Sequence, residues 1–127
     1  MNVALSHRTE GLATEPVRGA ARAVTLSAVA AVSSVTTAIT NSDATKRIRV
    51  VGYCLSTGTA GAISFRDSAG SPVTYFITYQ AANATGAIEL LPAGQFVLPA
   101  GLNLVLHHGG SATGTFTGTI FYNLEPI

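Results

Sequence analysis

The chain has 127 residues and a formal net charge of +1, and only 10% of its residues are charged. This length fits one domain with a core of its own and argues against a second domain. Because roughly 25% of residues are charged in an average soluble protein, little charge repulsion opposes association of this chain with other protein. The composition therefore argues against a strongly basic nucleic-acid-binding protein. It favours a component of an assembly, with a secreted or otherwise protected monomer as the alternative.

The first 22 residues are predicted to form an extended N-terminal arm, followed by a single domain over residues 23–127. This stretch shows neither the helical nor the strand period, and it contains Pro16. It also lacks the compact apolar core of a secretory signal, so synthesis and action without export are expected. The basic residues of the arm are Arg8, Arg18 and Arg22.

The stretch from Ala23 to Ser42 carries no charge, yet it is not predicted to span a membrane. Eight serine and threonine hydroxyls interrupt it, whereas a bilayer demands about 20 predominantly apolar residues. Its valine, threonine and isoleucine content favours strand instead.

The body of the chain is predicted to be a series of short strands separated by turn-forming residues. In the closing stretch, Phe116, Ile120 and Tyr122 fall on one side and the threonines on the other, the period of a half-buried strand. No segment has a convincing helical stripe. Strands at this spacing predict an all-β protein, an antiparallel β-sandwich or barrel. The expected strands are Ala23–Ala28, Ala30–Thr40, Arg47–Leu55, Ala62–Arg66, Val73–Tyr79, Ala87–Leu91, Phe96–Leu98, Leu102–His107 and Thr113–Tyr122.

A basic cluster of Lys46, Arg47 and Arg49 opens one of these strands. On a regular strand the two arginines share a face with Val51 and Tyr53. Such a basic and aromatic face can bind nucleic acid. A net charge near zero favours two other interpretations, namely salt bridges to an acidic neighbour or a solvated strand edge.

The lone cysteine, Cys54, excludes an intrachain disulfide. In the same regular strand it shares a face with Ile48 and Val50, which predicts a buried structural thiol. A catalytic thiolate needs a base and an electropositive setting, and the sequence shows neither nearby.

Histidines and carboxylates are too scattered to predict a catalytic or metal site. His107 and His108 are adjacent on a strand, so their side chains point to opposite faces, and His7 lies in the arm. Surface or turn histidines are expected, with a metal on the symmetry axis of an oligomer as the alternative. No carboxylates are paired at acid–base spacing, and no serine lies in a Gly-x-Ser-x-Gly elbow. We therefore expect no enzyme activity, cofactor or metal.

Four segments carry a resemblance to a known class of proteins: Lys46–Tyr53, Ser64–Arg66, Leu98–Leu106 and Thr117–Tyr122. Together they resemble the small jelly-roll or β-sandwich proteins of tailed bacteriophage virions. The closing segments also loosely resemble the last strands of trimeric jelly rolls of the tumour-necrosis-factor type. The resemblance implies a jelly-roll-like sandwich with a structural role, as a capsid decoration or cement protein or as a tail or fibre component.

From this resemblance we expect a non-enzymatic virion protein that is made in the host cytoplasm. It would bind the major capsid protein or another virion protein and form a trimer, with no role for membrane or nucleic acid. The alternative is a tail or fibre module that binds a receptor or glycan, in which exposed Tyr53, Tyr75 or Tyr79 would line a pocket. The candidate partner-binding residues are Arg8, Arg18, Arg22, Lys46, Arg47 and Arg49.

Overall fold

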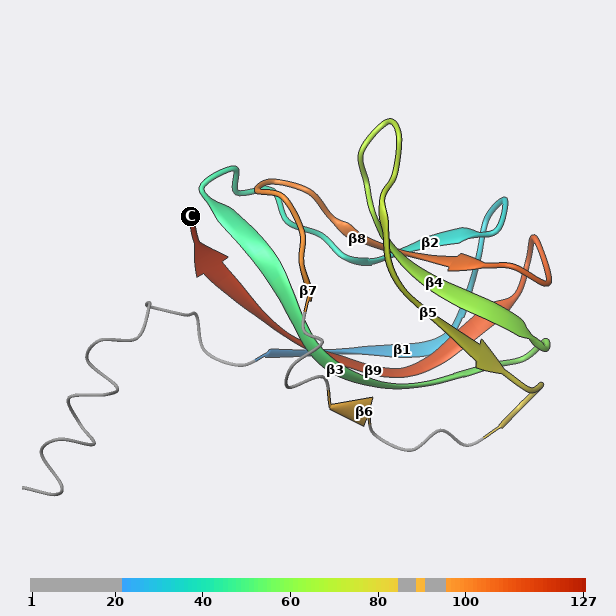
Figure 1. Cartoon of the computed structure of the whole chain (residues 1–127). Coiled ribbons are helices and arrows are strands. Elements are labelled where there is room, and N and C mark those ends of the chain that lie inside the picture. The colour runs from blue at the N-terminus through green and yellow to red at the C-terminus, as the bar shows by residue number, and fades with distance from the viewer. Residues whose placement is uncertain (1–21, 85–88, 91–95) are drawn as a thin grey trace, which may run out of the picture.

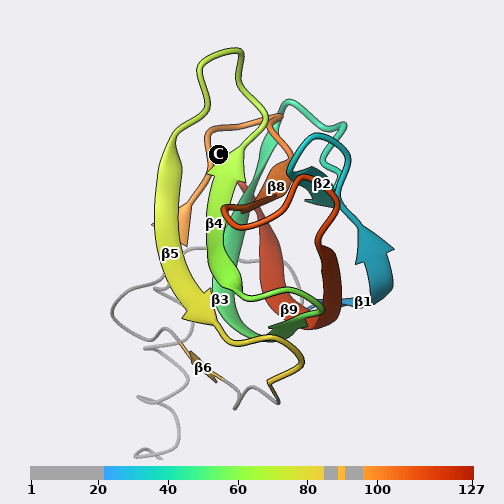
Figure 2. The same ribbon diagram turned by 90° about the vertical axis from the view of Figure 1, so that its right-hand side faces the viewer.

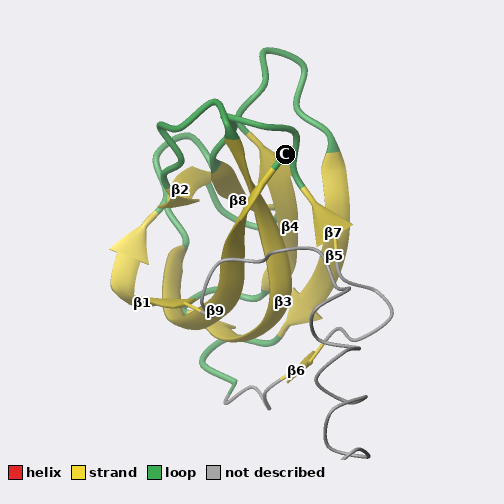
Figure 3. Ribbon diagram, turned by 90° about the vertical axis from the view of Figure 1, so that its left-hand side faces the viewer, coloured by secondary structure: helices red, strands yellow, loops and turns green. Residues whose placement is uncertain are grey.

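The protein folds as a sandwich of two antiparallel β-sheets (Figure 1). The computed structural model describes residues 22–84, 89–90 and 96–127, and within these ranges it contains strands and loops but no helix (Figure 3). The first sheet contains β1 (Arg22–Ala30), β9 (Thr115–Pro126), β3 (Lys46–Thr57) and β6 (Glu89–Leu90) in that order, with β7 (Phe96–Val97) also paired to β3. The second contains β2 (Val35–Ile39), β8 (Leu104–His108), β4 (Gly61–Asp67) and β5 (Thr74–Gln80). The predicted all-β antiparallel β-sandwich is confirmed.

Most consecutive strands belong to different sheets. The chain crosses between the sheets from β1 to β2, from β2 to β3 and from β3 to β4, and it crosses again on both sides of β8. Among the described strands, β4 and β5 are the one consecutive pair that forms a hairpin within a sheet. This path places β1 and β5 at opposite sides of the sandwich (Figure 2). Residues 1–21 of the predicted arm lie outside the described residues, and Arg22, which was assigned to the arm, is the first residue of β1.

Apolar side chains from both sheets fill the space between them. Phe116 and Ile120 of β9 are fully buried and Tyr122 packs partly buried against the core, so the alternation predicted for the closing strand is confirmed. Phe65 lies at the centre of an aromatic group, with ring centroids 5.2 to 6.0 Å from its neighbours. Tilted and edge-on contacts of this kind add to the stabilisation from burial alone. The neighbouring rings belong to Tyr53, Phe76 and Phe96.

One extra residue in β3 changes which side chains face the core. Val50 pairs with Tyr122 of β9 and Gly52 pairs with Phe121, so Val51 has no counterpart. A β-bulge of this kind shifts the alternation of the strand by one residue.

After the bulge, Tyr53 and Leu55 face the core, with exposed fractions of 3% and 1%, whereas Cys54 is only half-buried. Before the bulge, Ile48 and Val50 are fully buried. The expectation that Cys54 shares their face is therefore wrong, because it assumed a regular strand. For the same reason Tyr53 does not share an outer face with the arginines at the start of β3.

The loop between β4 and β5 is organised by Asp67, whose side chain is buried. One of its carboxylate oxygens accepts hydrogen bonds from the backbone N–H groups of Ala69 and Val73, at 3.1 and 3.2 Å. The other accepts from the Tyr75 hydroxyl at 2.8 Å. Burial on its own would raise the pKa of Asp67, but these three hydrogen bonds together lower it below its ordinary value.

Candidate functional site

Arg47 and Arg49, two of the predicted partner-binding residues, form salt bridges with Glu125 of the same chain. Arg49 makes two hydrogen bonds, from Nε to Oε2 at 2.8 Å and from Nη2 to Oε1 at 3.0 Å. Arg47 Nε donates to Oε1 at 3.1 Å. For these two arginines, the sequence-based interpretation of a salt bridge to an acidic neighbour is confirmed, and that neighbour lies near the end of β9.

In this group of Arg47, Arg49 and Glu125, the two arginines stabilise the charged form of the Glu125 carboxylate. Its side chain is only 6% exposed. The hydrogen bonds from Arg49, against the opposing effect of burial, lower the pKa of Glu125, and the positive charge of Arg47 lowers it further. Reciprocally, the bond to Glu125 raises the pKa of Arg49. The cluster thus joins the first residues of β3 to the last residues of β9. This contact was not predicted, because the closing strand was expected to end at Tyr122.

The other predicted partner-binding residues are spread across the chain. Arg22 is exposed at the start of β1, and Lys46 is half-buried opposite Pro126 at the start of β3. Within the described ranges, neither forms an ion pair. Arg8 and Arg18 lie outside these ranges, so the structure does not bring the six residues together, and their binding role stays a prediction.

His108 is a buried structural residue, not the surface histidine that was expected. It is 1% exposed, and its Nδ1 accepts hydrogen bonds from the backbone N–H groups of Gly110 and Ser111, both at 3.0 Å. Nδ1 is therefore unprotonated, and Nε2–H donates to the carbonyl oxygen of Thr59 at 2.9 Å. The imidazole ties the β8–β9 turn to the β3–β4 turn.

The outward-facing side of the second sheet is the strongest candidate for an interaction surface. Ser64 pairs with His107 on one neighbouring strand and with Ile77 on the other, so these side chains lie on one face. Ile77 is 53% exposed and Tyr79 is 82% exposed. We call this surface the Tyr79 face, and it consists of Ala62, Ser64, Arg66, Ile77, Tyr79, Val105 and His107.

Two polar atoms on the Tyr79 face lack hydrogen-bond partners. They are Arg66 Nε and His107 Nδ1, both buried from solvent. Burial lowers the pKa of His107, and the nearby positive charge of Arg66 lowers it further. Buried polar groups in native proteins are nearly always paired. A face that combines such atoms with exposed apolar side chains is typical of a surface completed by another molecule.

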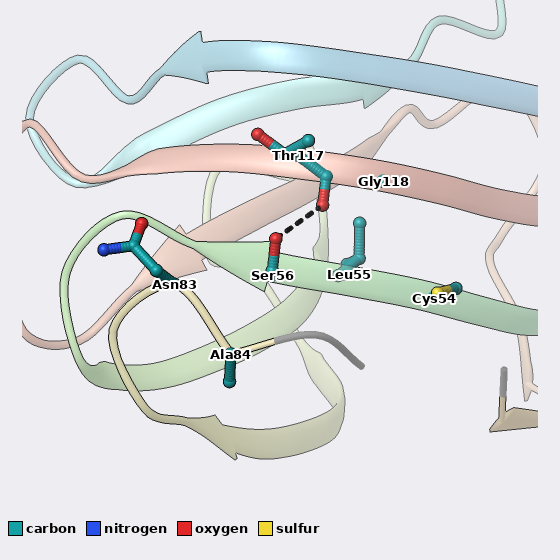
Figure 4. A pocket seen from close by; sticks show the side chains of 7 residues that line it. All are labelled: Cys54, Leu55, Ser56, Asn83, Ala84, Thr117 and Gly118. Carbon is teal, nitrogen blue, oxygen red and sulfur yellow. Dashed lines mark hydrogen bonds between the residues drawn. The ribbon is translucent and has the colours of Figure 1, made fainter. Parts of the chain in front are cut away.

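A shallow pocket of about 180 Å³ lies on the outer side of the first sheet. Its lining offers one thiol, two hydroxyls and one amide, but no imidazole or carboxylate (Figure 4). Ser56 Oγ donates to the carbonyl oxygen of Thr117 at 3.5 Å, a long contact. This set lacks the base that a cysteine or serine nucleophile requires. The lining residues are Cys54, Leu55, Ser56, Asn83, Ala84, Thr117 and Gly118.

The tyrosines expected for a receptor site are dispersed. Tyr53 is in the core, and Tyr75 is half-buried, stacked on Phe96 at a centroid distance of 5.5 Å. Only Tyr79 is largely exposed among the three, and none of them lines the pocket described above.

Within the part of the chain that the structure describes, no three histidine, cysteine or carboxylate side chains are grouped to hold a metal ion. Over the same residues, no helix has the length and apolar character needed to cross a membrane. Comparisons of the chain with protein-family models, curated proteins and solved structures find no match.

Proposed function

We propose that this chain is a non-enzymatic structural protein of a virion, acting as a capsid decoration or cement protein. The observation that carries the proposal is the Tyr79 face, where Ile77 and Tyr79 are exposed beside the unpaired Arg66 Nε and His107 Nδ1. Contact with another protein would cover the exposed apolar side chains. A chain with a net charge of +1 opposes such contacts only weakly.

The strand order supports the jelly-roll form of the sandwich that the sequence resemblance implies. The two sheets have the strand orders β1-β9-β3-β6 and β2-β8-β4-β5. At most connections the chain passes from one sheet to the other. A jelly roll consists of two such sheets built from two Greek keys. Because one fold serves many functions, this agreement supports the jelly-roll architecture alone. The proposed function is tested through residues on the surface.

In the proposed mechanism, the protein binds the assembled shell in preference to its separate subunits. Such a ligand stabilises the state that it binds by mass action. The partner is the major capsid protein or another virion protein. The N-terminal arm, with Arg8 and Arg18, and Arg22 at the start of β1 contribute contacts to carboxylates on that partner. Copies of the chain associate with one another as a trimer.

The proposal is tested by co-sedimentation with empty viral particles, using the intact chain, a chain without residues 1–21, and the variant Arg66→Met. The methionine keeps an apolar stem at position 66 but removes the donor group of the Tyr79 face. We expect the intact chain to sediment with the particles and both variants to bind more weakly while remaining folded by circular dichroism. An intact chain without affinity for particles would overturn the proposal.

The second candidate function is a tail or fibre module that binds a receptor or glycan. The observation that favours it is Tyr79, since an exposed aromatic ring at 82% accessibility suits stacking on a sugar. This alternative predicts binding of the purified chain to cells or to a glycan array, with loss of binding in Tyr79→Ala.

A further inference from the structure

Strand β5 forms an open edge of the second sheet. It pairs with β4 on one side, and no other described strand pairs with it. Figure 2 shows β5 at the side of the sandwich opposite to β1. The other edge strand of this sheet, β2, is less accessible, because β1 packs beside it and Thr36 Oγ1 donates to the Ala30 carbonyl oxygen at 3.0 Å.

This edge lacks the usual protection against pairing with another strand. Natural edge strands carry charged side chains or proline, or they are disrupted by bulges. β5 has no charged residue and no proline over Thr74–Gln80. Its one irregularity lies between the pairs Phe65–Phe76 and Arg66–Thr74, where Tyr75 has no counterpart on β4. As far as the described residues show, the stretch from Phe76 to Gln80 is therefore a regular edge without these protections.

The sequence of this regular stretch is suited to pairing with itself. In an antiparallel pair of two copies centred on Thr78, Ile77 of one copy lies opposite Tyr79 of the other, and the reverse holds by symmetry. Both side chains lie on the Tyr79 face, so two aromatic and β-branched pairs form there. On the inward side Thr78 meets its own copy, another favourable cross-strand pair.

We propose that the β5 edge binds the β5 edge of a second copy of this chain, antiparallel about a two-fold axis at Thr78. The partner is a second copy because the contact is self-complementary in register and no charge in β5 opposes it. Pairing would join two four-stranded sheets into one continuous sheet and place Ile77 of each copy beside Tyr79 of the other. This two-fold contact joins two single chains or two trimers. It does not rest on the virion function, so a chain without affinity for particles would still pair.

The first experiment measures the mass of the full-length chain by sedimentation equilibrium from the micromolar to the millimolar range. Ile77→Lys and Tyr79→Lys each place a charge on the pairing edge at an exposed position. Each is expected to weaken pairing about tenfold or more. At intermediate concentration the mass of the assembly would then fall by half. The matched control is Val32→Lys, at a residue that is 74% exposed outside β5. It should pair like the unmodified chain.

The second experiment tests the register by disulfide trapping in a full-length Cys54→Ser background. Two Cα atoms directly opposite in an antiparallel pair are about 4.5 to 5.5 Å apart, a distance that a disulfide spans. Thr78→Cys should therefore give a covalent pair under mild oxidation. Thr74→Cys should not, because it lies outside the symmetric stretch. A chain that does not self-associate, a mass unaffected by Tyr79→Lys, or equal cross-linking at positions 74 and 78 would each overturn the proposal.

Discussion

Arg49 binds both carboxylate oxygens of Glu125, although the residue directly opposite Glu125 in the β3–β9 ladder is Arg47. The diagonal partner makes the two shorter bonds, at 2.8 and 3.0 Å, and the direct partner makes one at 3.1 Å. A guanidinium that binds both oxygens of a carboxylate forms a stronger and more directional pair than one that binds a single oxygen. The Arg47 side chain is also 42% exposed, twice the 21% of Arg49.

Removal of Arg49 should therefore destabilise the fold more than removal of Arg47. Arg49→Ala is expected to lower the free energy of unfolding by about 1.5 to 3 kcal/mol, because it leaves a buried carboxylate with one partner. Arg47→Ala, the matched control, should cost at most about 1 kcal/mol because its pair is screened by solvent. Urea denaturation of the two variants checks this order. Equal losses would contradict the assignment of Arg49 as the main partner.

Acid should weaken the fold through the same cluster. The folded-state pKa of Glu125 is lowered from its ordinary value of 4.5. The contribution of Glu125 to the stability of the fold is therefore fully present above pH 4.5 and is lost as the pH falls through the lowered folded-state pKa. Asp67, whose folded-state pKa is also lowered, acts in the same direction.

The pH dependence is measured as the free energy of unfolding in urea, from neutral pH down through the range of carboxyl titration. Glu125→Gln should reduce the loss of stability on acidification while being less stable than the unmodified chain at neutral pH. If Glu125→Gln lost unfolding free energy on acidification as steeply as the unmodified chain, Glu125 would have the same pKa in the folded and unfolded states.

The alternation of apolar and polar residues was sufficient to predict the sandwich, but not the details that depend on long-range pairing. Phe116 and Ile120 face the core because nothing interrupts the period of β9 between them. In β3, the run Val50, Val51 and Gly52 is compatible with either phase, so only the pairing with β9 reveals the bulge that turns Cys54 away from the core.

The candidate site also depends on long-range pairing that the local sequence pattern does not reveal. Glu125 was outside the predicted closing strand, so its pairing with the arginines across β3 and β9 could not be anticipated from local pattern. The alternation in β5 allowed either face to be the inner one, and the packing of Phe76 against Phe65 decides it. That choice is what exposes Ile77 and Tyr79.

The Asp67 carboxylate should be essential for the β4–β5 loop. Asp67→Ala leaves two backbone N–H groups and the Tyr75 hydroxyl without their acceptor, and is expected to cost about 2 to 3 kcal/mol of unfolding free energy. Tyr75→Phe removes one of these three bonds and should cost about 1 kcal/mol. Urea unfolding of both variants tests the difference. A larger loss for Tyr75→Phe would assign the loop's stability to the hydroxyl instead.

Tyr75 also reports on this loop by titration. Burial and the hydrogen bond to Asp67 raise the pKa of Tyr75 to about 12. In Asp67→Asn the charge is removed but burial remains, so the pKa should fall only part of the way toward the ordinary value of 10.0. Ultraviolet titration of the phenols measures this shift, and an unchanged titration would show that Asp67 does not act on the hydroxyl.

Gly118 of β9 should tolerate a side chain poorly, because of its backbone angle and its closeness to β3. Its φ is +139°, a conformation that side chains rarely adopt, and a Cβ at this position would collide with the carbonyl oxygen of Cys54. β9 is the central strand between β1 and β3, so it cannot move away from one without losing the other. Gly118→Ala is therefore expected to destabilise the protein by about 2 kcal/mol or more, from strain and overpacking together.

The matched control is Gly70, where an added Cβ would have no atom within 4 Å. Gly70→Ala should change the free energy of unfolding by at most about 0.5 kcal/mol, like most exposed substitutions. Urea unfolding of the two variants separates local strain from the general loss of glycine flexibility, which both share. If Gly118→Ala were as stable as Gly70→Ala, β3 and β9 would have to separate locally at low cost, and the pocket beside Cys54 would be adaptable instead of fixed by the ladder.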